Sequence, residues 1–123
     1  MSVLELNEAN LESTITDHPF VIIDFWAPWC GPCRGFAPVF EAAAEKHTNI
    51  VFAKVNTENE QGIAGQFQIR SIPTLMIFRD QIIIYSQPGS MPAGQFDELI
   101  AKASELDMDQ VRADIAKEQP QAS

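Results

Sequence analysis

Two cysteines, Cys30 and Cys33, are the residues of this chain best suited to chemistry. Only two residues separate them, so the thiols are close enough to form a disulfide, and an apolar helical pattern begins directly after them. At the start of a helix, free backbone N–H groups and the helix dipole stabilise a thiolate. We therefore predict that Cys30 attacks substrate disulfides to give a mixed disulfide, which Cys33 then resolves.

A zinc site is one alternative use of the pair, because two cysteines can supply half of the four ligands that zinc normally takes. The chain has no further cysteine, however, and the spacing of its histidines, His18 and His47, matches no usual ligand pattern. No metal is therefore expected. A second alternative is a pair of inert core thiols. Gly31 and Pro32 between the cysteines, with Trp29 before them, indicate a turn and make this alternative less favoured than catalysis.

Asp24 interrupts the apolar run at residues 20–26, just before the cysteines. Burying a carboxylate without a partner costs several kcal/mol and raises its pKa. Asp24 is therefore a candidate to carry a proton to or from Cys33, through a water molecule. Lys54, in the neighbouring apolar run, is the candidate charge partner. The alternative is that Asp24 and Lys54 both lie at a sheet edge and reach solvent.

Hydrophobic periodicity indicates the elements that hold these residues. The run at residues 20–26 is continuous, which predicts a strand covered on both faces, and residues 49–56 predict a second buried strand. Apolar runs at 75–78 and 81–85, around Arg79 and Asp80, predict a hairpin, and residues 87–89 predict a turn. Helical spacing marks residues 11–16 with Asn10 as N-cap, 34–47 with a kink at Pro38, 60–67, and a helix from Pro92 onward.

This order of elements combines parallel crossovers with an antiparallel hairpin. It predicts an α/β fold with a central mixed sheet and helices on both faces. We expect one domain over residues 1–106, followed by an extension at 107–123. Met108, Val111 and Ile115 keep helical spacing within that extension, and the polar end at 119–123 favours a solvated extension over a docking helix.

Composition restricts the class of protein further. The 123 residues are 46% hydrophobic and 20% charged, as expected for one soluble domain. Eight basic against seventeen acidic residues give a net charge of −9, which argues against nucleic acid and anionic membranes as partners. The first five residues do not indicate a secretory signal, so a cytoplasmic location is expected. No nucleotide or flavin motif is present, and no cofactor is expected.

Three motifs together carry a family resemblance. The string DFWAPWCGPC at residues 24–33, then SIPT at residues 71–74, and the pair Pro88 and Gly89 occur in this order. With this spacing the chain resembles the thioredoxin family over about residues 4–106. The resemblance implies the thioredoxin fold and protein-disulfide reductase activity, which contributes to redox homeostasis in the cell.

The resemblance also implies roles for individual residues. Cys30 would be the attacking and Cys33 the resolving thiol, Asp24 the buried acid/base, and Lys54 its neighbouring charge. Pro73 would follow a cis peptide bond and let an extended substrate approach the dithiol. The surface that binds substrate would comprise Trp29, Gly31, Pro32, Ile72, Pro73 and Gly89.

Partners follow from the same resemblance. It implies disulfide-containing target proteins, a flavoprotein thioredoxin reductase as electron donor, and a monomer, and the Gly-Pro pair between the cysteines favours reduction over oxidation or isomerisation. A chaperone-like or complex-forming binding module on the same fold is the alternative. The chain departs from the family pattern at Arg79 to Gln81, where a turn with glycine is usual, and at Arg34, where lysine is usual.

Overall fold

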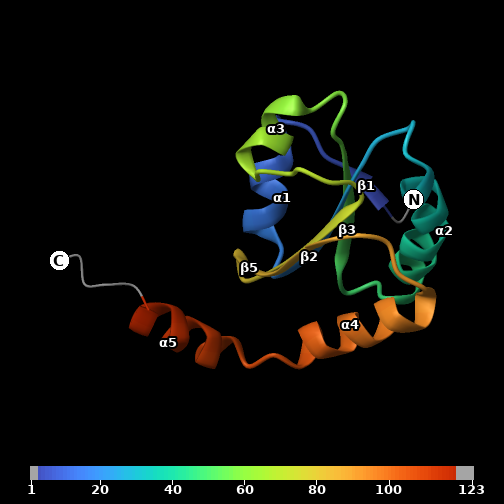
Figure 1. Ribbon diagram of the computed structural model, residues 1–123. Coiled ribbons are helices and arrows are strands. Elements are labelled where there is room, and N and C mark those ends of the chain that lie inside the picture. Colours follow the sequence, from blue (N-terminus) through green and yellow to red (C-terminus); the bar gives the residue numbers. More distant parts are fainter. Residues whose placement is uncertain (1–2, 119–123) are drawn as a thin grey trace.

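A five-stranded mixed sheet forms the centre of the computed structural model, which describes residues 3–118 (Figure 1). The strands are β1 (Val3–Glu5), β2 (Phe20–Trp26), β3 (Val51–Asn56), β4 (Thr74–Arg79) and β5 (Ile82–Pro88). The helices are α1 (Leu11–Asp17), α2 (Gly31–Lys46), α3 (Gln61–Gln66), α4 (Ala93–Glu105) and α5 (Met108–Glu118). The strand order is β1-β3-β2-β4-β5; β3 pairs in parallel with β1 and β2, whereas β4 pairs antiparallel with β2 and β5. The predicted mixed sheet with helices on both faces is confirmed.

Strand β2 is the central strand, and both of its faces are covered. Figure 1 shows α1 and α3 on one side of the sheet and α2 and α4 on the other. Because side chains alternate along a strand, Val21, Ile23 and Phe25 pack on the α1 and α3 side. Phe20 and Ile22 pack on the α2 and α4 side. Asp24 has the same parity as this second pair and therefore points to α2, the helix that carries the cysteines.

A cluster of phenylalanines fixes α2 on this face of the sheet. Phe36 and Phe40 on α2 lie 5.3 and 5.9 Å, between ring centroids, from Phe96 on α4, and Phe40 lies 5.4 Å from Phe52 on β3. All four rings are almost completely buried. Aromatic pairs at such distances add to the energy of simple burial. The cluster therefore holds the helix that begins at the cysteine pair in one position over the strands.

The first strand is absent from the sequence prediction, which places no element before residue 11. β1 pairs in parallel with β3, with Leu4 opposite Ala53. It has only three residues and none of them is fully buried, so no alternation identifies it. Asn10 does occupy the predicted N-cap of α1, but its side chain makes no capping bond there. Its amide instead binds backbone atoms of Glu5 and Asn7 and so joins α1 to β1.

The β4–β5 hairpin matches the prediction except at its ends. Asp80 and Gln81 form the turn with φ of 53° and 70°, a left-handed pair of the kind that two-residue hairpins require and that glycine usually supplies. The predicted turn at residues 87–89 is wrong for its first two residues, because β5 continues through Pro88, which pairs with Thr74. Proline is tolerated there because β5 is an edge strand.

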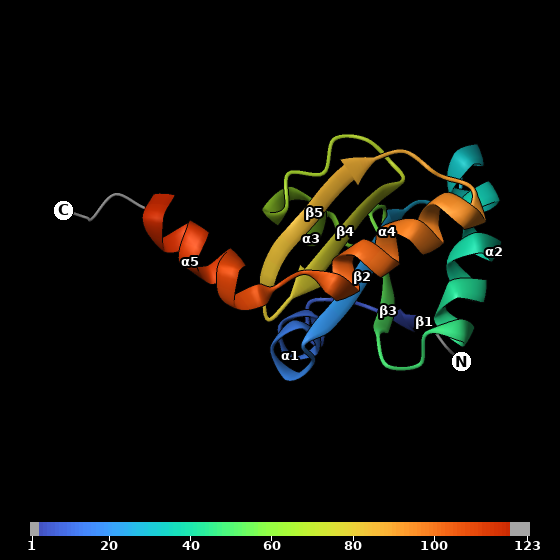
Figure 2. The same cartoon turned by 90° about the horizontal axis from the view of Figure 1, so that it is seen from below.

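Residues beyond α4 form a second helix rather than continuing the first. The carboxylate of Asp107 accepts hydrogen bonds from the backbone N–H groups of Asp109 and Gln110, at 3.0 and 3.2 Å, and so caps α5. Met108 is buried, and Arg112 forms an ion pair with Asp80 of the hairpin turn at 2.9 Å. Figure 2 shows α5 extending past the end of the sheet. The predicted polar end at 119–123 lies outside the described residues.

Candidate active site at the cysteine pair

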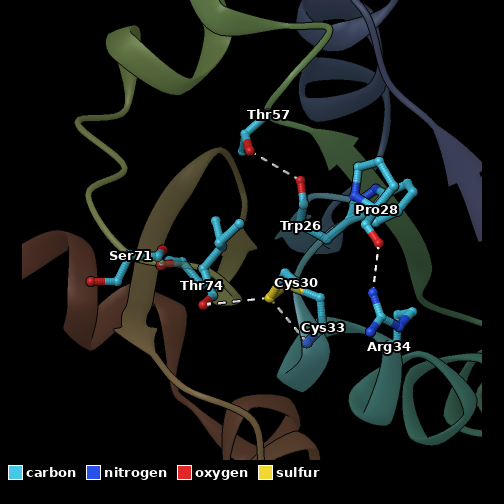
Figure 3. Close-up of a disulfide and its surroundings, with 9 residues drawn as sticks. Trp26, Pro28, Cys30, Cys33, Arg34, Thr57, Ser71 and Thr74 are labelled. Atoms are coloured by element: carbon cyan, nitrogen blue, oxygen red, sulfur yellow. Dashed lines mark hydrogen bonds between the residues drawn. A yellow bond between two sulfur atoms is a disulfide. The ribbon is translucent and has the colours of Figure 1, made fainter.

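Cys30 and Cys33 are joined by a disulfide at the start of α2, with their Cα atoms 5.2 Å apart (Figure 3). The spacing argument, which predicts that these two thiols can bond, is confirmed. Cys30 is the N-cap residue of α2, and its Sγ accepts a hydrogen bond from the backbone N–H of Cys33 at 3.2 Å. Pro32 fits in the first turn because its missing N–H is not needed there. Cys30 is 5% exposed and Cys33 2%, so both residues are buried and Cys30 slightly less so.

The residues predicted to bind substrate come together beside Cys30. Ile72 packs against the cysteines, and its carbonyl oxygen lies 3.8 Å from Cys30 Sγ. The Ile72–Pro73 peptide bond is cis, as the resemblance implies. The N–H of Gly89 donates to the carbonyl of Pro73 at 2.8 Å, and its φ of +109° suits glycine. Trp29, which directly precedes Cys30, is 65% exposed.

Asp24 lies behind the disulfide, in the wall of a small cavity. The cavity has a volume of about 80 Å³ and also contacts Cys33 and Lys54. Asp24 is 4% exposed, and its Oδ1 has no hydrogen-bond partner among residues 3–118. Its strand is the central one, so the alternative of a solvent-facing carboxylate at a sheet edge is wrong. Burial raises the pKa of Asp24 from 3.8 to about 7, and the positive charge of Lys54 opposes this shift.

Lys54 is placed opposite Asp24 by the register of β2 and β3, in which the two residues are direct partners. It is half-buried, and its Nζ lies 5.1 Å from the centroid of the Trp26 ring, within the range of a cation–π contact. Sequence reasoning missed Trp26 as part of this site. The signal was available, because Trp26 follows Asp24 by two residues and therefore shares its face of the strand.

Arg34 and Glu41 of α2 are two further residues of the cavity wall that sequence reasoning did not place there. Arg34 Nη1 donates a hydrogen bond to the carbonyl oxygen of Pro28 at 2.8 Å (Figure 3). Both residues are exposed, so Arg34, Glu41 and the half-buried Lys54 form a charged rim around the buried Asp24. Helical spacing places Arg34 and Glu41 on one face, but only the packing against the sheet directs that face to Asp24.

Neither a metal site nor a membrane span is found in the described part of the chain. Between residues 3 and 118, no three His, Cys, Asp or Glu side chains gather in a metal-binding group. The two histidines make other contacts: His18 Nδ1 lies 2.9 Å from the Thr14 carbonyl, and His47 lies beside Asp97. Within the same range, no helix has the length and apolar character needed to cross a bilayer.

The sequence of this chain is similar to those of known thioredoxins. The sequence profile of the family described as Thioredoxin matches residues 2–105. A relative from Streptomyces coelicolor, described as putative thioredoxin 2, is 50% identical over 121 residues, which cover 98% of this chain and 90% of the relative. A thioredoxin from Haemophilus influenzae is 38% identical over 100 residues, covering 80% of this chain and 94% of the relative.

Solved structures show the same similarity. A mutant thioredoxin from Halobacterium salinarum superposes with a TM-score of 0.78 at 31% identity, covering 86% of this chain and 94% of that one. Plasmodium falciparum thioredoxin gives a TM-score of 0.75 at 29% identity, covering 80% and 97%. A bonded cysteine pair at a helix start, in a chain this similar to known thioredoxins, performs thiol–disulfide exchange. The chain therefore belongs to the thioredoxin family of thiol–disulfide oxidoreductases.

Proposed function

We propose that this protein reduces disulfides in other proteins, with Cys30 as the attacking thiol and Cys33 as the resolving thiol. The observation that carries the assignment is the hydrogen bond from the Cys33 N–H to Cys30 Sγ at the N-cap of α2. A backbone donor and the helix dipole both stabilise the negative charge that Cys30 carries as a thiolate once the disulfide is reduced. Cys33 Sγ has no such donor among the described residues, and Cys33 is slightly more buried than Cys30.

The reaction then proceeds in two balanced exchanges. The Cys30 thiolate attacks one sulfur of the substrate disulfide, and the other substrate sulfur leaves as a thiolate. Cys33 next gives up its proton and attacks Cys30 Sγ, which releases the second substrate thiolate and leaves the Cys30–Cys33 disulfide. Asp24 is the group that takes the Cys33 proton, since both line one cavity and the pKa of Asp24, about 7, suits proton transfer near neutral pH.

Substrate binds as an extended segment beside Cys30. The exposed ring of Trp29 and the half-buried Ile72 supply apolar contacts near the sulfur. Pro73 and Gly89 lie in the segments before β4 and after β5, which the hydrogen bond from the Gly89 N–H to the Pro73 carbonyl joins, and these segments form the backbone edge along which the substrate lies. Gly31 and Pro32, both exposed in the first turn of α2, complete this surface. In this arrangement a substrate cysteine approaches Cys30 before Cys33.

Three further assignments belong to the same proposal. A flavoprotein thioredoxin reductase regenerates the dithiol, because each turnover leaves this chain oxidised. The protein works as a monomer in the cytoplasm, since one chain supplies every group named above and a cytoplasmic reductant is needed. Residues 1–106 form the catalytic domain, and the extension at 107–123 lies outside it, as the position of α5 away from α2 supports (Figure 2).

Reduction of insulin disulfides with dithiothreitol as electron source tests the proposal. The wild-type protein is expected to accelerate the reaction, while Cys30→Ser and Cys33→Ser both abolish turnover. Its dithiol is also expected to be strongly reducing when equilibrated with glutathione. Turnover by Cys30→Ser, or a wild-type rate no faster than dithiothreitol alone, would overturn the assignment. A strongly oxidising potential would exclude the reductase direction.

A further inference from the structure

We propose that Arg34 is a positioning residue for the dithiol, because its bond to the Pro28 carbonyl keeps the segment that carries both cysteines closed after the disulfide opens. This inference rests on the proposed function, since it concerns the reduced state that attacks substrate. It assigns Arg34 more than the positive charge that the sequence indicates. Arginine at this position, where lysine is usual, therefore restricts the loop before Cys30 in addition to supplying charge.

The loop that leads to Cys30 has few other attachments. Upstream, both the N–H and the hydroxyl of Thr57 hold the Trp26 carbonyl, at 2.8 and 3.1 Å. Downstream, the Cys30 N–H donates to the Ala27 carbonyl at 3.2 Å. Among the described residues, Arg34 is the one side chain that hydrogen-bonds the backbone of residues 27–29. That loop is exposed at Pro28, so without Arg34 its position would depend on backbone contacts alone.

The Arg34 bond spans the cysteine pair. Pro28 lies two residues before Cys30 and Arg34 directly follows Cys33, so the bond closes a seven-residue segment around both sulfurs (Figure 3). The Arg34 N–H also donates to the Cys30 carbonyl at 3.2 Å, within the helix. In the oxidised protein the disulfide and the guanidinium contact act in parallel. Reduction breaks the covalent link, and the guanidinium contact remains to restrict the loop.

A restricted loop changes the equilibrium between dithiol and disulfide. Holding Cys30 near Cys33 in the reduced state raises the effective concentration of one thiol toward the other. Loss of one exposed hydrogen bond of this kind is expected to lower the equilibrium constant for disulfide formation about two- to fourfold. The same constraint favours the resolving step, because Cys33 must reach Cys30 in the mixed disulfide.

The positive charge of Arg34 shifts the equilibrium between dithiol and disulfide in the direction opposite to its hydrogen bond. The two effects can be measured separately with suitable variants. A positive charge near Cys30 stabilises its thiolate and hence the reduced protein, so loss of charge alone favours disulfide formation. Besides the buried Asp24, three charged side chains line the cavity, namely Arg34, Lys54 and Glu41. Arg34→Met removes one positive charge from this rim, and adding Glu41→Gln restores the net charge without restoring the bond to Pro28. Arg34→Lys keeps the charge and a single donor.

The experiment is equilibration of each variant with reduced and oxidised glutathione at neutral pH, followed by acid quenching and mass spectrometry. In this equilibrium one glutathione disulfide oxidises the protein dithiol and yields two glutathione thiols, so no protein substrate is needed. We expect Arg34→Met/Glu41→Gln, which has the net charge of the wild type, to lower the equilibrium constant for disulfide formation about two- to fourfold relative to the wild-type protein. Arg34→Lys, which keeps the charge and a single donor, should lower it less. Alkylation rates against pH report the Cys30 thiol pKa in the same variants.

An equilibrium constant for the double variant that equals or exceeds that of the wild type would overturn the role of Arg34. A fall that is fully explained by a changed Cys30 pKa would also overturn it, because charge rather than position would then be the cause. Failure of the proposed function is a separate result: it would appear as absent insulin reduction by the wild-type protein. Arg34 is exposed, so circular dichroism is expected to show an intact fold in every variant.

Discussion

Replacing Asp24 with asparagine is expected to stabilise the fold at alkaline pH and to leave its stability unchanged near pH 4. Burial raises the pKa of this carboxyl from 3.8 to about 7. Between these values the folded state binds a proton that the unfolded state has lost, so the free energy of unfolding falls as pH rises through this window. A shift of about three pKa units corresponds to about 4 kcal/mol of destabilisation above pH 7. Asparagine removes the ionisation and with it this cost.

Urea unfolding of the wild-type protein and of Asp24→Asn, from about pH 4 to about pH 9, measures this difference. The gain in stability of the variant should rise with pH up to about pH 8 and then level off, approaching about 4 kcal/mol. Asp17→Asn is the matched control, because Asp17 is an exposed residue of α1, and it should show no such pH-dependent gain. The reasoning is refuted if Asp24→Asn is no more stable at pH 9 than the wild type, or if its gain is the same at every pH.

Three other changes test neighbouring parts of the structure. Lys54→Met should raise the pKa of Asp24 further, because the opposing positive charge is lost, and the pH dependence of dithiol exchange should shift upward with it. An unchanged pH profile would exclude this coupling. Phe96→Ala should cost about 3–5 kcal/mol in urea unfolding, since Phe96 is fully buried at the centre of the aromatic cluster, and a loss below about 1 kcal/mol would contradict its central place in the core. Arg112→Met should speed hydrogen exchange in α5 while leaving global stability unchanged, because its ion pair with Asp80 holds only that helix; identical exchange in both proteins would argue against the attachment.

The central strand and the cysteine site were predictable because each is encoded locally. The continuous apolar run of β2 indicates burial on both faces, and alternation along it places Asp24 on the same face as Phe20 and Ile22. The CxxC spacing alone establishes that Cys30 and Cys33 can bond. These features depend on residues within a few positions of one another.

The features that sequence did not reveal depend on contacts between distant segments. β1 is too short to show a period and is recognisable only from its pairing with β3. The Asp80 and Gln81 turn adopts left-handed φ values without glycine, held between two paired strands. The contact of Lys54 with Trp26 follows from the β2–β3 register, which no single segment specifies.

The order of attack is tested most directly by reacting reduced Cys33→Ser and reduced Cys30→Ser with the same disulfide substrate near neutral pH. Peptide mass spectrometry then identifies the cysteine that carries the adduct. The Cys30 sulfur has the backbone N–H donor at the helix start, so Cys33→Ser should form a stable mixed disulfide through Cys30, and much faster than Cys30→Ser reacts. Equal or faster adduct formation at Cys33 would contradict the account.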